Sequence, residues 1–422
     1  MVQRKNVIIG CGHGALSALK AIRAFDRDCD VVVVTREEHP PYSPTVLPYI
    51  LANKTDVSRF CLADEAFFDK MGASFIMKKE VISIEPENKE IIYKDGDRED
   101  YNTLLIATGS RPVFPSIKGL KETGFFDLHT VGDCQRLLKH LQGGMDIAIL
   151  GAGLIGIEVA MALRQRGHRI KVIEREDRIL PLYFDREGAT LVDRVLRDQG
   201  IETFTGKQAV EVKRDRGKRV IDLFDGSFID TEILISAAGV EPSISLLQGS
   251  GVRTNQGVLV DNQMMTNIPD IYAAGDVAES PNFFTKEPGV SAIIPIAIAQ
   301  GKVAGIHMAG GDGSEYQGWI PMNIFPFFGN VACSVGVCLN GGQVLMEMDE
   351  ERKRLKKLIF QEERLVGAMF VNVTVDPGVI LYLIEKRLDL GQYKEMLFER
   401  PREMSRWLMM ETERKEGMSV QA

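Results

Sequence analysis

The stretch VIIGCGHGA, residues 7–15, decides how the N-terminal part of this chain folds. An apolar segment runs into Gly10 and Gly12, and the following ALSALKAIRAF has the apolar spacing of a helix. A second apolar segment, DVVVVT, ends at Thr35. Strand, glycine-rich turn, helix and strand in this order predict a βαβ unit whose turn receives the pyrophosphate of a dinucleotide.

The residues of this turn have separate physical roles in such a unit. We expect Gly10 to allow the tight turn, Gly12 to let the backbone approach the phosphates, and Ala15 to permit close packing of the helix on the strand. The phosphates would lie at the helix N-terminus, where N–H groups and the helix dipole favour negative charge. An acidic residue should follow to bind a ribose, and Glu37, with Arg36 beside it, is the candidate.

The same pattern recurs at residues 147–174. The segment IAIL leads into GAGLIG, from Gly151 to Gly156, and a helix-like segment and a second strand follow, ending at Glu174. A carboxylate there accepts hydrogen bonds from the adenosine ribose and repels a 2′-phosphate, which favours NAD(H) over NADP(H). Arg175 follows directly, and since an arginine could accept that phosphate, NADP(H) remains the alternative. Two complete units in one chain suggest a flavin and a nicotinamide nucleotide.

Four further segments carry a family resemblance: TLLIATGSRP (103–112), ILISAAGVEP (233–242), TNIPDIYAAGDVA (266–278) and PIAIAQGKVAG (295–305). In this order around the two turns, the chain resembles the FAD-dependent pyridine nucleotide oxidoreductases. Within this family it resembles the rubredoxin and ferredoxin reductase branch and the flavin module of nitrite reductase. The resemblance covers roughly residues 5–310. It implies an α/β fold with two Rossmann-like domains, an FAD domain split by an inserted NAD domain, and a small α+β C-terminal domain.

The expected domain boundaries follow from this resemblance. The FAD-binding domain would comprise residues 1–115 and 241–317, and the NAD-binding domain residues 116–240. Residues 318–422 would form a C-terminal interface domain and tail, in which residues 353–397 indicate a β-hairpin, a turn and two helices.

The resemblance also implies roles for residues at the strand ends. Asp276 would accept a hydrogen bond from a ribitol hydroxyl of FAD, and the helix starting near Ile296 would direct its N-terminal N–H groups at the flavin. Gly239 would lie near the nicotinamide. The FAD-binding candidates are Gly10, Gly12, Gly14, Ala15, Arg36, Glu37, Ser43, Pro44, Val81, Ala107, Thr108, Gly109, Arg111, Gly275, Asp276, Ile296 and Ala297. The NAD-binding candidates are Gly151, Gly153, Leu154, Ile155, Gly156, Glu174 and Gly239.

Glu158, which follows the second turn in GLIGIE, is the catalytic candidate. In the family, a carboxylate here projects toward the nicotinamide and is often paired with a lysine from a loop of the first domain. In the rubredoxin reductase branch that loop reads like YSKP, whereas residues 42–45 read YSPT, so Pro44 stands in the lysine position. Lys54 or Arg111 could substitute for the lysine, and a solvated helix residue is the alternative for Glu158.

The loop PYSPTVLPY, residues 41–49, also lacks the cysteine that thiol-dependent relatives use next to the flavin. Cys61 follows too far along the chain to fill that position, and Cys11 in the phosphate turn is expected to pack against the sheet. The chain contains no CxxC and no His/Cys cluster with metal-ligand spacing. Electrons would therefore leave to a one-electron carrier, either an iron–sulfur protein or a partner subunit.

Composition limits the other partners. The 422 residues fit two or three domains, and the net charge of −8 argues against nucleic acid or an anionic membrane. No segment reaches the roughly 18 consecutive apolar residues of a membrane helix, and the N-terminal apolar run is too short for a signal peptide. We therefore expect a cytoplasmic protein.

Two parts of the C-terminal region leave alternatives open. The aromatic run at 325–327 could wall the isoalloxazine ring or belong to an ordinary aromatic core. Residues 393–415 mix methionine, tryptophan and charge, and predict a short amphipathic helix after Pro401. That helix could bind a partner or pack against its own domain.

The leading hypothesis is an FAD-containing electron-transfer subunit or reductase between NAD(H) and an iron–sulfur protein or subunit, within a hetero-oligomer. The chain also resembles the FAD subunits of anaerobic, NAD-reducing 2-oxoacid dehydrogenase complexes of the phenylglyoxylate dehydrogenase type. The alternatives are a peroxide-forming NADH oxidase and a flavoprotein scaffold with redox-dependent binding.

Overall fold

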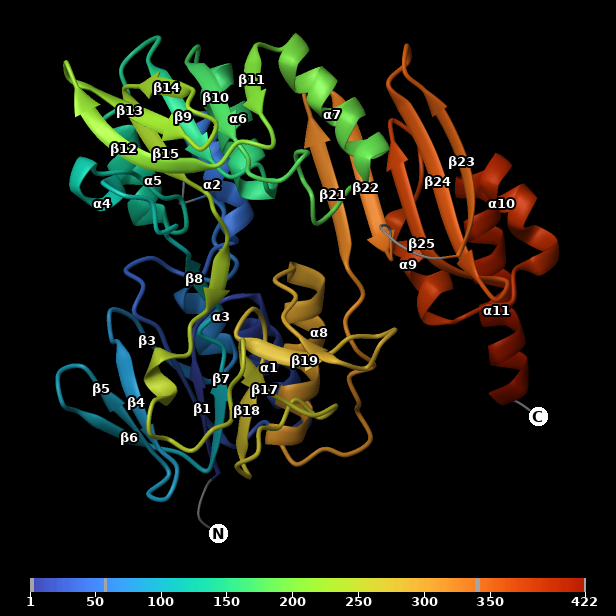
Figure 1. The fold of residues 1–422 in the computed structure, drawn as a ribbon. Helices are drawn as coiled ribbons and strands as arrows, with labels where there is room; N and C mark the ends of the chain where they lie inside the picture. The colour runs from blue at the N-terminus through green and yellow to red at the C-terminus, as the bar shows by residue number, and fades with distance from the viewer. Residues whose placement is uncertain (1–3, 57–58, 338–341, 421–422) are drawn as a thin grey trace. The chain divides into compact units, whose positions relative to one another are not determined.

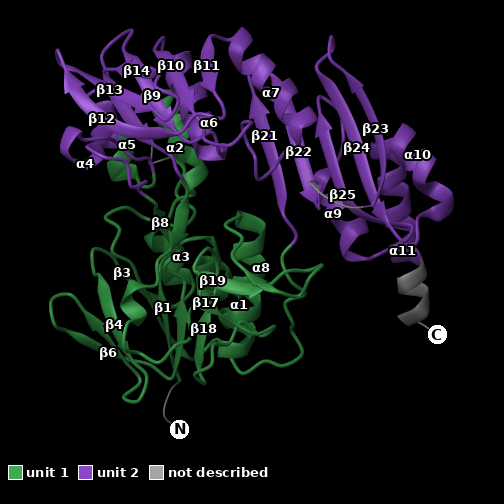
Figure 2. Ribbon diagram, in the orientation of Figure 1, with its two compact units in different colours: residues 1–113, 129–134, 239–319 green, residues 114–128, 135–238, 320–422 purple. Residues whose placement is uncertain are grey.

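The structure is a computed structural model that describes residues 4–56, 59–337 and 342–420 (Figure 1). The chain forms two compact units, each assembled from segments far apart in the sequence (Figure 2). Unit 1 comprises residues 1–113, 129–134 and 239–319, and unit 2 comprises residues 114–128, 135–238 and 320–422.

A parallel five-stranded sheet forms the centre of unit 1, in the order β18-β7-β1-β2-β3. Four strands come from the first segment and β18 from the last, so the two halves of the split domain share one sheet. Val7, Ile8 and Val33 are fully buried within the hydrophobic core of unit 1, as is typical of a parallel sheet that is covered on both faces. The strands are β1 (Lys5–Ile9), β2 (Asp30–Val34), β3 (Ala73–Ile76), β7 (Thr103–Ile106) and β18 (Ile271–Ala273).

Helices α1 (His13–Phe25) and α8 (Ile294–Met308) pack against each other backbone to backbone. A Cβ atom on Gly301 would lie 2.1 Å from the carbonyl oxygen of Gly14, and one on Gly305 would lie 2.4 Å from that of Ala18. Only glycine permits this approach, so the small residues of both helices fix how the N-terminal and C-terminal parts of unit 1 join.

Smaller elements complete unit 1. Two further sheets are antiparallel, and in a third β17 pairs parallel with β19 and β19 antiparallel with β20. Their strands are β4 (Val81–Glu85), β5 (Glu90–Tyr93) and β6 (Arg98–Asp100); β8 (Ser110–Pro112) and β16 (Val240–Pro242); and β17 (Val258–Leu259), β19 (Ala278–Pro281) and β20 (Pro288–Gly289). The helical segments are η1 (Pro44–Val46), α2 (Leu47–Leu51), α3 (Glu65–Lys70) and η3 (Ser245–Leu247).

Unit 2 contains a second parallel sheet, ordered β11-β10-β9-β15, and an antiparallel sheet, ordered β12-β13-β14. The parallel strands are β9 (Asp146–Leu150), β10 (Arg169–Ile173), β11 (Ile201–Phe204) and β15 (Ile233–Ser236). The antiparallel strands are β12 (Ala209–Asp215), β13 (Lys218–Leu223) and β14 (Phe228–Thr231). The helices are α4 (Leu120–Thr123), α5 (Val131–Leu138, which begins in unit 1), α6 (Leu154–Gln165) and α7 (Arg186–Asp198).

The C-terminal part of unit 2 is a five-stranded antiparallel sheet, ordered β21-β22-β25-β24-β23, followed by helices. Its strands are β21 (Met322–Phe327), β22 (Asn330–Gly336), β23 (Gln343–Asp349), β24 (Arg354–Gln361) and β25 (Arg364–Val371). Its helices are α9 (Pro377–Glu385), η4 (Gly391–Tyr393), α10 (Lys394–Glu399) and α11 (Pro401–Val420). The predicted hairpin, turn and two helices are confirmed, and the helix after Pro401 is longer than expected, at 20 residues.

The α/β fold class is confirmed, with two Rossmann-like domains, the first split by the second, and a small α+β C-terminal domain. The aromatic run in β21 belongs to the core. Phe325 and Phe327 are 0% and 1% exposed and stack with their ring centroids 5.2 Å apart. Rings this deeply buried have no surface left to wall a flavin, so Phe325 and Phe327 belong to an aromatic core, whereas Pro326 between them is exposed. No helix among the described residues is long and apolar enough to cross a membrane.

Candidate functional site

The first glycine-rich turn connects β1 to α1. Gly10 has φ +110°, and a Cβ atom there would lie 2.1 Å from the carbonyl oxygen of Ala107, so no other residue fits. A Cβ atom on Gly12 would meet nothing within 4 Å, and Gly12 precedes α1 without a side-chain cap. Gly14 faces Ala297 of α8 across a close backbone contact. The turn is therefore a rigid cradle that opens at a helix N-terminus, as a pyrophosphate requires.

The YAAGD segment at the end of β18 is held by side chains to which the motifs assigned no role. The N–H of Gly275 donates to the side-chain carbonyl of Gln300 over 2.8 Å, and the Gln300 amide donates to Ser280 over 2.9 Å. Asp276 accepts a hydrogen bond from Ser110 over 2.9 Å, and burial raises its pKa. Gln300 is fully buried in the apolar run PIAIAQG of α8, and that isolated polar residue was the available signal.

The first residue of α1, His13, reaches the loop that replaces the family's lysine or cysteine. Its Nε2 atom lies 3.1 Å from the hydroxyl oxygen of Ser43, which lies 2.8 Å from that of Thr45. Burial lowers the pKa of His13, and the negative charge of Asp276, which acts in the opposite direction, only partly offsets this effect. Pro44 begins the short helix η1. The loop and the phosphate turn are thus joined by a chain of neutral hydrogen bonds, which the GxGxxA pattern alone did not reveal.

The structure corrects the argument that kept Cys61 away from this loop. The backbone of Cys61 forms an isolated β-bridge with Tyr42, and the N–H of Leu62 donates to Pro41 over 2.7 Å. The intervening chain folds back through α2, so distance along the sequence was misleading. Cys11 behaves as predicted, since it packs in the core of unit 1 and burial, with a contribution from the charge of Glu37, raises its pKa to about 11.

Two candidates, Arg36 and Glu37, follow β2, and a third, Val81, lies in β4. The carboxylate of Glu37 lies near enough to influence the Cys11 thiol, and its N–H donates to Thr35 over 3.2 Å. Arg36 is exposed. Val81 begins β4 and packs against the hydrophobic core of unit 1. Of the two charged neighbours, Glu37 is therefore the one that faces the turn.

Two segments of unit 1 that are far apart in the sequence, around Thr108 and around Ser243, lie side by side. The hydroxyl of Thr108 donates to the carbonyl of Ser243 over 2.9 Å, and the N–H of Ser243 donates to Gly109 over the same distance. Strands β8 and β16 pair directly afterwards. Arg111, in β8, forms an ion pair with Glu241 at 2.8 Å, so its charge is already engaged within unit 1.

Gly239, which directly precedes β16, has free space beside its backbone. Its φ is +115°, and a Cβ atom would meet nothing within 4 Å. Lys54, the other candidate to replace the family lysine, is exposed after α2.

The second glycine-rich turn repeats the geometry of the first. Gly151 has φ +102°, and a Cβ atom there would lie 2.4 Å from the carbonyl oxygen of Ala237. Gly153 is open, with no atom within 4 Å of such a Cβ. A Cβ atom on Gly156 would lie 2.1 Å from the oxygen of Gly151, which explains the third glycine. Helix α6 begins at Leu154, and Ile155 in its first turn is exposed.

Glu174 directly follows β10 and is 8% exposed. One carboxylate oxygen accepts the N–H of Ala152 over 2.7 Å, and the other accepts the N–H of Glu176 over 2.9 Å. Each oxygen keeps a second lone pair for a ligand hydroxyl. Glu174 therefore connects the phosphate cradle to the place where a ribose would lie.

Glu158 lies on α6, one turn beyond the second cradle. It is half-buried, and burial raises its pKa from 4.5 to about 7. Its charge, together with burial, raises the pKa of the nearby Tyr183. No described residue of unit 2 forms an ion pair with Glu158. Burial distinguishes Glu158 from a fully solvated helix residue, and a raised pKa is common among functional carboxyl groups.

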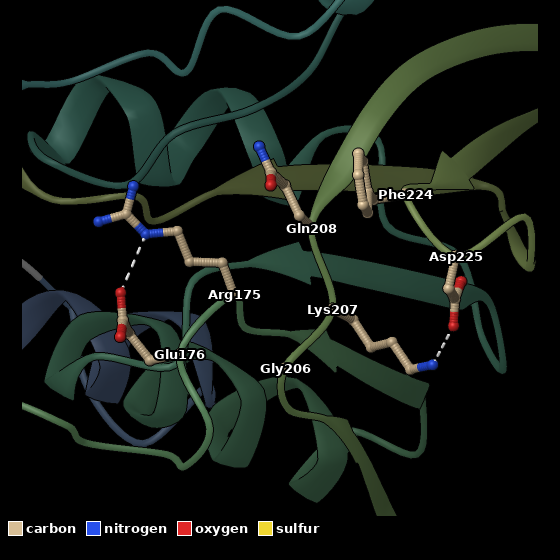
Figure 3. Close-up of a pocket in the computed structure, with 7 residues that line it drawn as sticks. All are labelled: Arg175, Glu176, Gly206, Lys207, Gln208, Phe224 and Asp225. Atoms are coloured by element: carbon tan, nitrogen blue, oxygen red, sulfur yellow. Dashed lines mark hydrogen bonds and ion pairs between the residues drawn. The ribbon is translucent and has the colours of Figure 1, made fainter.

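A pocket of about 270 Å³ is lined in part by Arg175 and Glu176, the two residues that follow Glu174 in the chain (Figure 3). Its residues come from the loop after β10, the loop before β12 and the β13–β14 turn, and its position could not be predicted from the motifs. The lining residues are Arg175, Glu176, Gly206, Lys207, Gln208, Phe224 and Asp225. Among the described residues, no cluster of His, Cys, Asp and Glu could hold a metal ion.

Comparisons with known proteins agree with this geometry. Residues 4–301 match the family described as pyridine nucleotide-disulphide oxidoreductase. The chain is 34% identical to the epsilon subunit of NADH-dependent phenylglyoxylate dehydrogenase from Aromatoleum evansii, over 97% of this chain and 98% of that subunit. It is 30% identical to an NADH oxidase of Methanocaldococcus jannaschii, over 86% and 81% of the two chains. The NADH:rubredoxin oxidoreductase structure from Clostridium acetobutylicum superposes with a TM-score of 0.73 at 25% identity, covering 93% and 97% of the two chains.

Proposed function

The chain belongs to the pyridine nucleotide-disulphide oxidoreductase family, and on this premise we propose that it transfers electrons between NAD(H) and a partner protein. It is an oxidoreductase that uses FAD and NAD(H). The observation that carries the proposal is the presence of two open glycine cradles in one chain, at Gly12 and Gly153. The loop beside the first cradle, residues 41–49, offers hydroxyl groups and no thiol of its own.

The residues of unit 1 fit FAD. Gly12 leaves space at the N-terminus of α1 for the pyrophosphate, and Glu37 would accept hydrogen bonds from the ribose. Asp276 would accept a ribitol hydroxyl, and α8 begins without a capping side chain, so its N–H groups would face the flavin. FAD, when bound, can take two electrons from NADH and release them one at a time.

The residues of unit 2 fit the nicotinamide nucleotide. Gly153 would face its pyrophosphate, and Glu174 would accept the hydroxyls of its adenosine ribose. Glu158 has a pKa near 7, so its carboxyl group can either donate or accept a hydrogen bond at neutral pH. We propose that it orients the nicotinamide by hydrogen bonding and exchanges a proton with water.

We further propose that the electron acceptor or donor is an iron–sulfur protein or subunit of the same complex. The similarity to the phenylglyoxylate dehydrogenase subunit extends over nearly the whole of both chains, which supports a role in an NAD-reducing 2-oxoacid dehydrogenase complex. Met396, Trp407 and Met410 are exposed on α10 and α11 and could contribute to a partner surface. The reduced thiols Cys11 and Cys29 suit a cytoplasmic compartment.

The test is anaerobic turnover of the purified holoprotein. We expect NADH to bleach the flavin and to reduce a viologen dye rapidly, and oxygen to be consumed much more slowly. Purification from the native cell without oxygen should yield co-eluting iron–sulfur chains. Oxygen consumption as fast as dye reduction would instead favour a peroxide-forming NADH oxidase. The similarity to the NADH oxidase of M. jannaschii supports this second candidate. If FAD binds tightly but NADH does not bleach the flavin, the remaining hypothesis is a flavoprotein scaffold with redox-dependent binding.

A further inference from the structure

The pocket beside Glu174 is fixed to that residue by the backbone. The N–H of Lys207 donates to the carbonyl of Glu174 over 2.9 Å, and the N–H of Gly206 donates to that of Glu176 over 2.7 Å. Since Glu174 is the residue that would bind the adenosine ribose, the pocket begins where the 2′ position of that ribose would point. This step rests on the proposed nucleotide site in unit 2.

The pocket contains two cations, and each is paired with its own acid (Figure 3). The Nε atom of Arg175 lies 3.1 Å from a carboxylate oxygen of Glu176, and the ammonium of Lys207 forms an ion pair with Asp225. The other oxygen of Asp225 accepts hydrogen bonds from the hydroxyl of Ser227 over 2.6 Å and from its N–H over 3.1 Å. Lys207 and Ser227 lower the pKa of Asp225, so this acid is ionised at neutral pH.

We propose that Glu176 and Asp225 are specificity-determining residues that make the site select NADH over NADPH. A 2′-phosphate carries close to two negative charges at neutral pH and needs cations that can turn toward it. Arg175 and Lys207 lie next to the ribose acid, but their charges are balanced by the two neighbouring carboxylates. The phosphate would therefore meet Glu174 and a pocket with no net positive charge.

The exposure of the pairs determines the size of the effect. The side chains of Arg175 and Glu176 are 76% and 51% exposed, and those of Lys207 and Asp225 are 36% and 41% exposed. Ion pairs this exposed are weak, so the two acids act mainly through their charge, which cancels that of Arg175 and Lys207, and the effect of neutralising them is modest. Neutralising both acids should thus raise NADPH selectivity by about tenfold, with Glu174 still opposing the phosphate.

The experiment compares the double variant Glu176→Gln/Asp225→Asn with the wild-type holoprotein. The ratio of kcat/KM for NADPH to that for NADH, measured with a viologen dye, should rise about tenfold. The affinity for 2′,5′-ADP, measured by calorimetry without turnover, should rise by a similar factor. A matched control is Glu211→Gln/Asp222→Asn, which removes two carboxylates that pair with Lys213, outside the pocket lining. In the control both quantities should stay within twofold of wild type.

Lys207→Ala in the double-variant background should abolish at least half of the gain, because it removes one of the released cations. The proposal is overturned if the double variant leaves both quantities unchanged, if the control raises them equally, or if the gain is undiminished without Lys207. Absence of any NADH turnover in the wild-type protein would instead refute the proposed function. The calorimetric comparison with 2′,5′-ADP would still test the pocket in that case.

Discussion

The carboxylate of Glu174 accepts a hydrogen bond from the backbone N–H of Ala152, over 2.7 Å. Ala152 lies inside the second glycine-rich turn, so the acid at the end of β10 supports the phosphate cradle before any ligand binds. The same side chain would then accept the ribose hydroxyls with its remaining lone pairs. One residue therefore combines a structural role with a proposed binding role.

The substitution Glu174→Ala should raise the KM for NADH by about tenfold and leave the FAD content unchanged. The variant loses the ribose acceptor and leaves the N–H of Ala152 without its buried partner, at a cost of about 1–3 kcal/mol. Steady-state kinetics and the flavin absorbance of the purified protein measure the two quantities. The KM of Glu174→Gln, which keeps an acceptor oxygen, should lie between those of the wild type and Glu174→Ala. Unaltered NADH kinetics in the alanine variant would mean that the second turn binds a different nucleotide.

Alanine at the two open glycines should separate the two nucleotide sites. Gly12→Ala and Gly153→Ala place a methyl group where no protein atom lies within 4 Å, so the apoprotein should melt at the wild-type temperature. Gly12→Ala should lose FAD, whereas Gly153→Ala should keep FAD and bind NADH more weakly. Gly10→Ala is the contrast, because its Cβ atom would collide with Ala107 and lower the stability of the fold itself. Full FAD retention in Gly12→Ala would contradict the assignment of the first cradle.

The raised pKa of Glu158 predicts a pH dependence near neutrality. Folding favours the protonated carboxyl, since burial raises its pKa from 4.5 to about 7. Its stabilising contribution is complete below pH 4.5 and is lost as the pH rises to about 7. The melting temperature of the apoprotein should therefore fall over this interval more steeply in wild type than in Glu158→Gln. Flavin reduction by NADH should show a step near pH 7 that this variant lacks; parallel profiles for the two proteins would remove Glu158 from the mechanism.

Asp185 should stabilise unit 2 in two separable ways. Its carboxylate caps α7 by accepting the N–H of Gly188 over 2.9 Å, and it pairs with Lys357 of β24 at 2.5 Å, both side chains being 13% exposed. Asp185→Asn keeps the cap and should cost about 2 kcal/mol by leaving Lys357 without its partner. Asp185→Ala should cost about 1 kcal/mol more, for the lost cap. The exposed pair of Asp198 with Lys353 provides the control, and Asp198→Asn should leave the thermal midpoint almost unchanged.

Cys61 lies beside Tyr42 in the structure, which makes its removal an informative test. We expect Cys61→Ser to reduce viologen with NADH at the wild-type rate, because the proposed electron path leaves the flavin for a partner protein. A second expectation is that thiol-modifying reagents leave this activity intact in wild type. A large loss in the serine variant would show that a thiol takes part, and the loop would then resemble that of the thiol-dependent relatives in function.

The local parts of the fold could be predicted because a few residues impose them. Gly10 and Gly151 require a left-handed backbone under a nearby carbonyl, and the apolar segments on either side have the periods of strand and helix. The C-terminal hairpin and helices could be predicted for the same reason, since their patterns depend on residues close together in the sequence. By contrast, Gln300 meets Gly275, and Cys61 meets Tyr42, only after the chain has folded back.

The sequence by itself determined where the two cradles lie and which strand ends could bind a ribose, since turn geometry and periodicity depend on neighbouring residues. Only the tertiary structure decided what surrounds them. It placed Phe325 and Phe327 on the buried face of β21, raised the pKa of Glu158 by burial, and brought Lys207 and Asp225 to Arg175. Burial and charge pairing depend on contacts between distant segments, and no local pattern specifies those contacts.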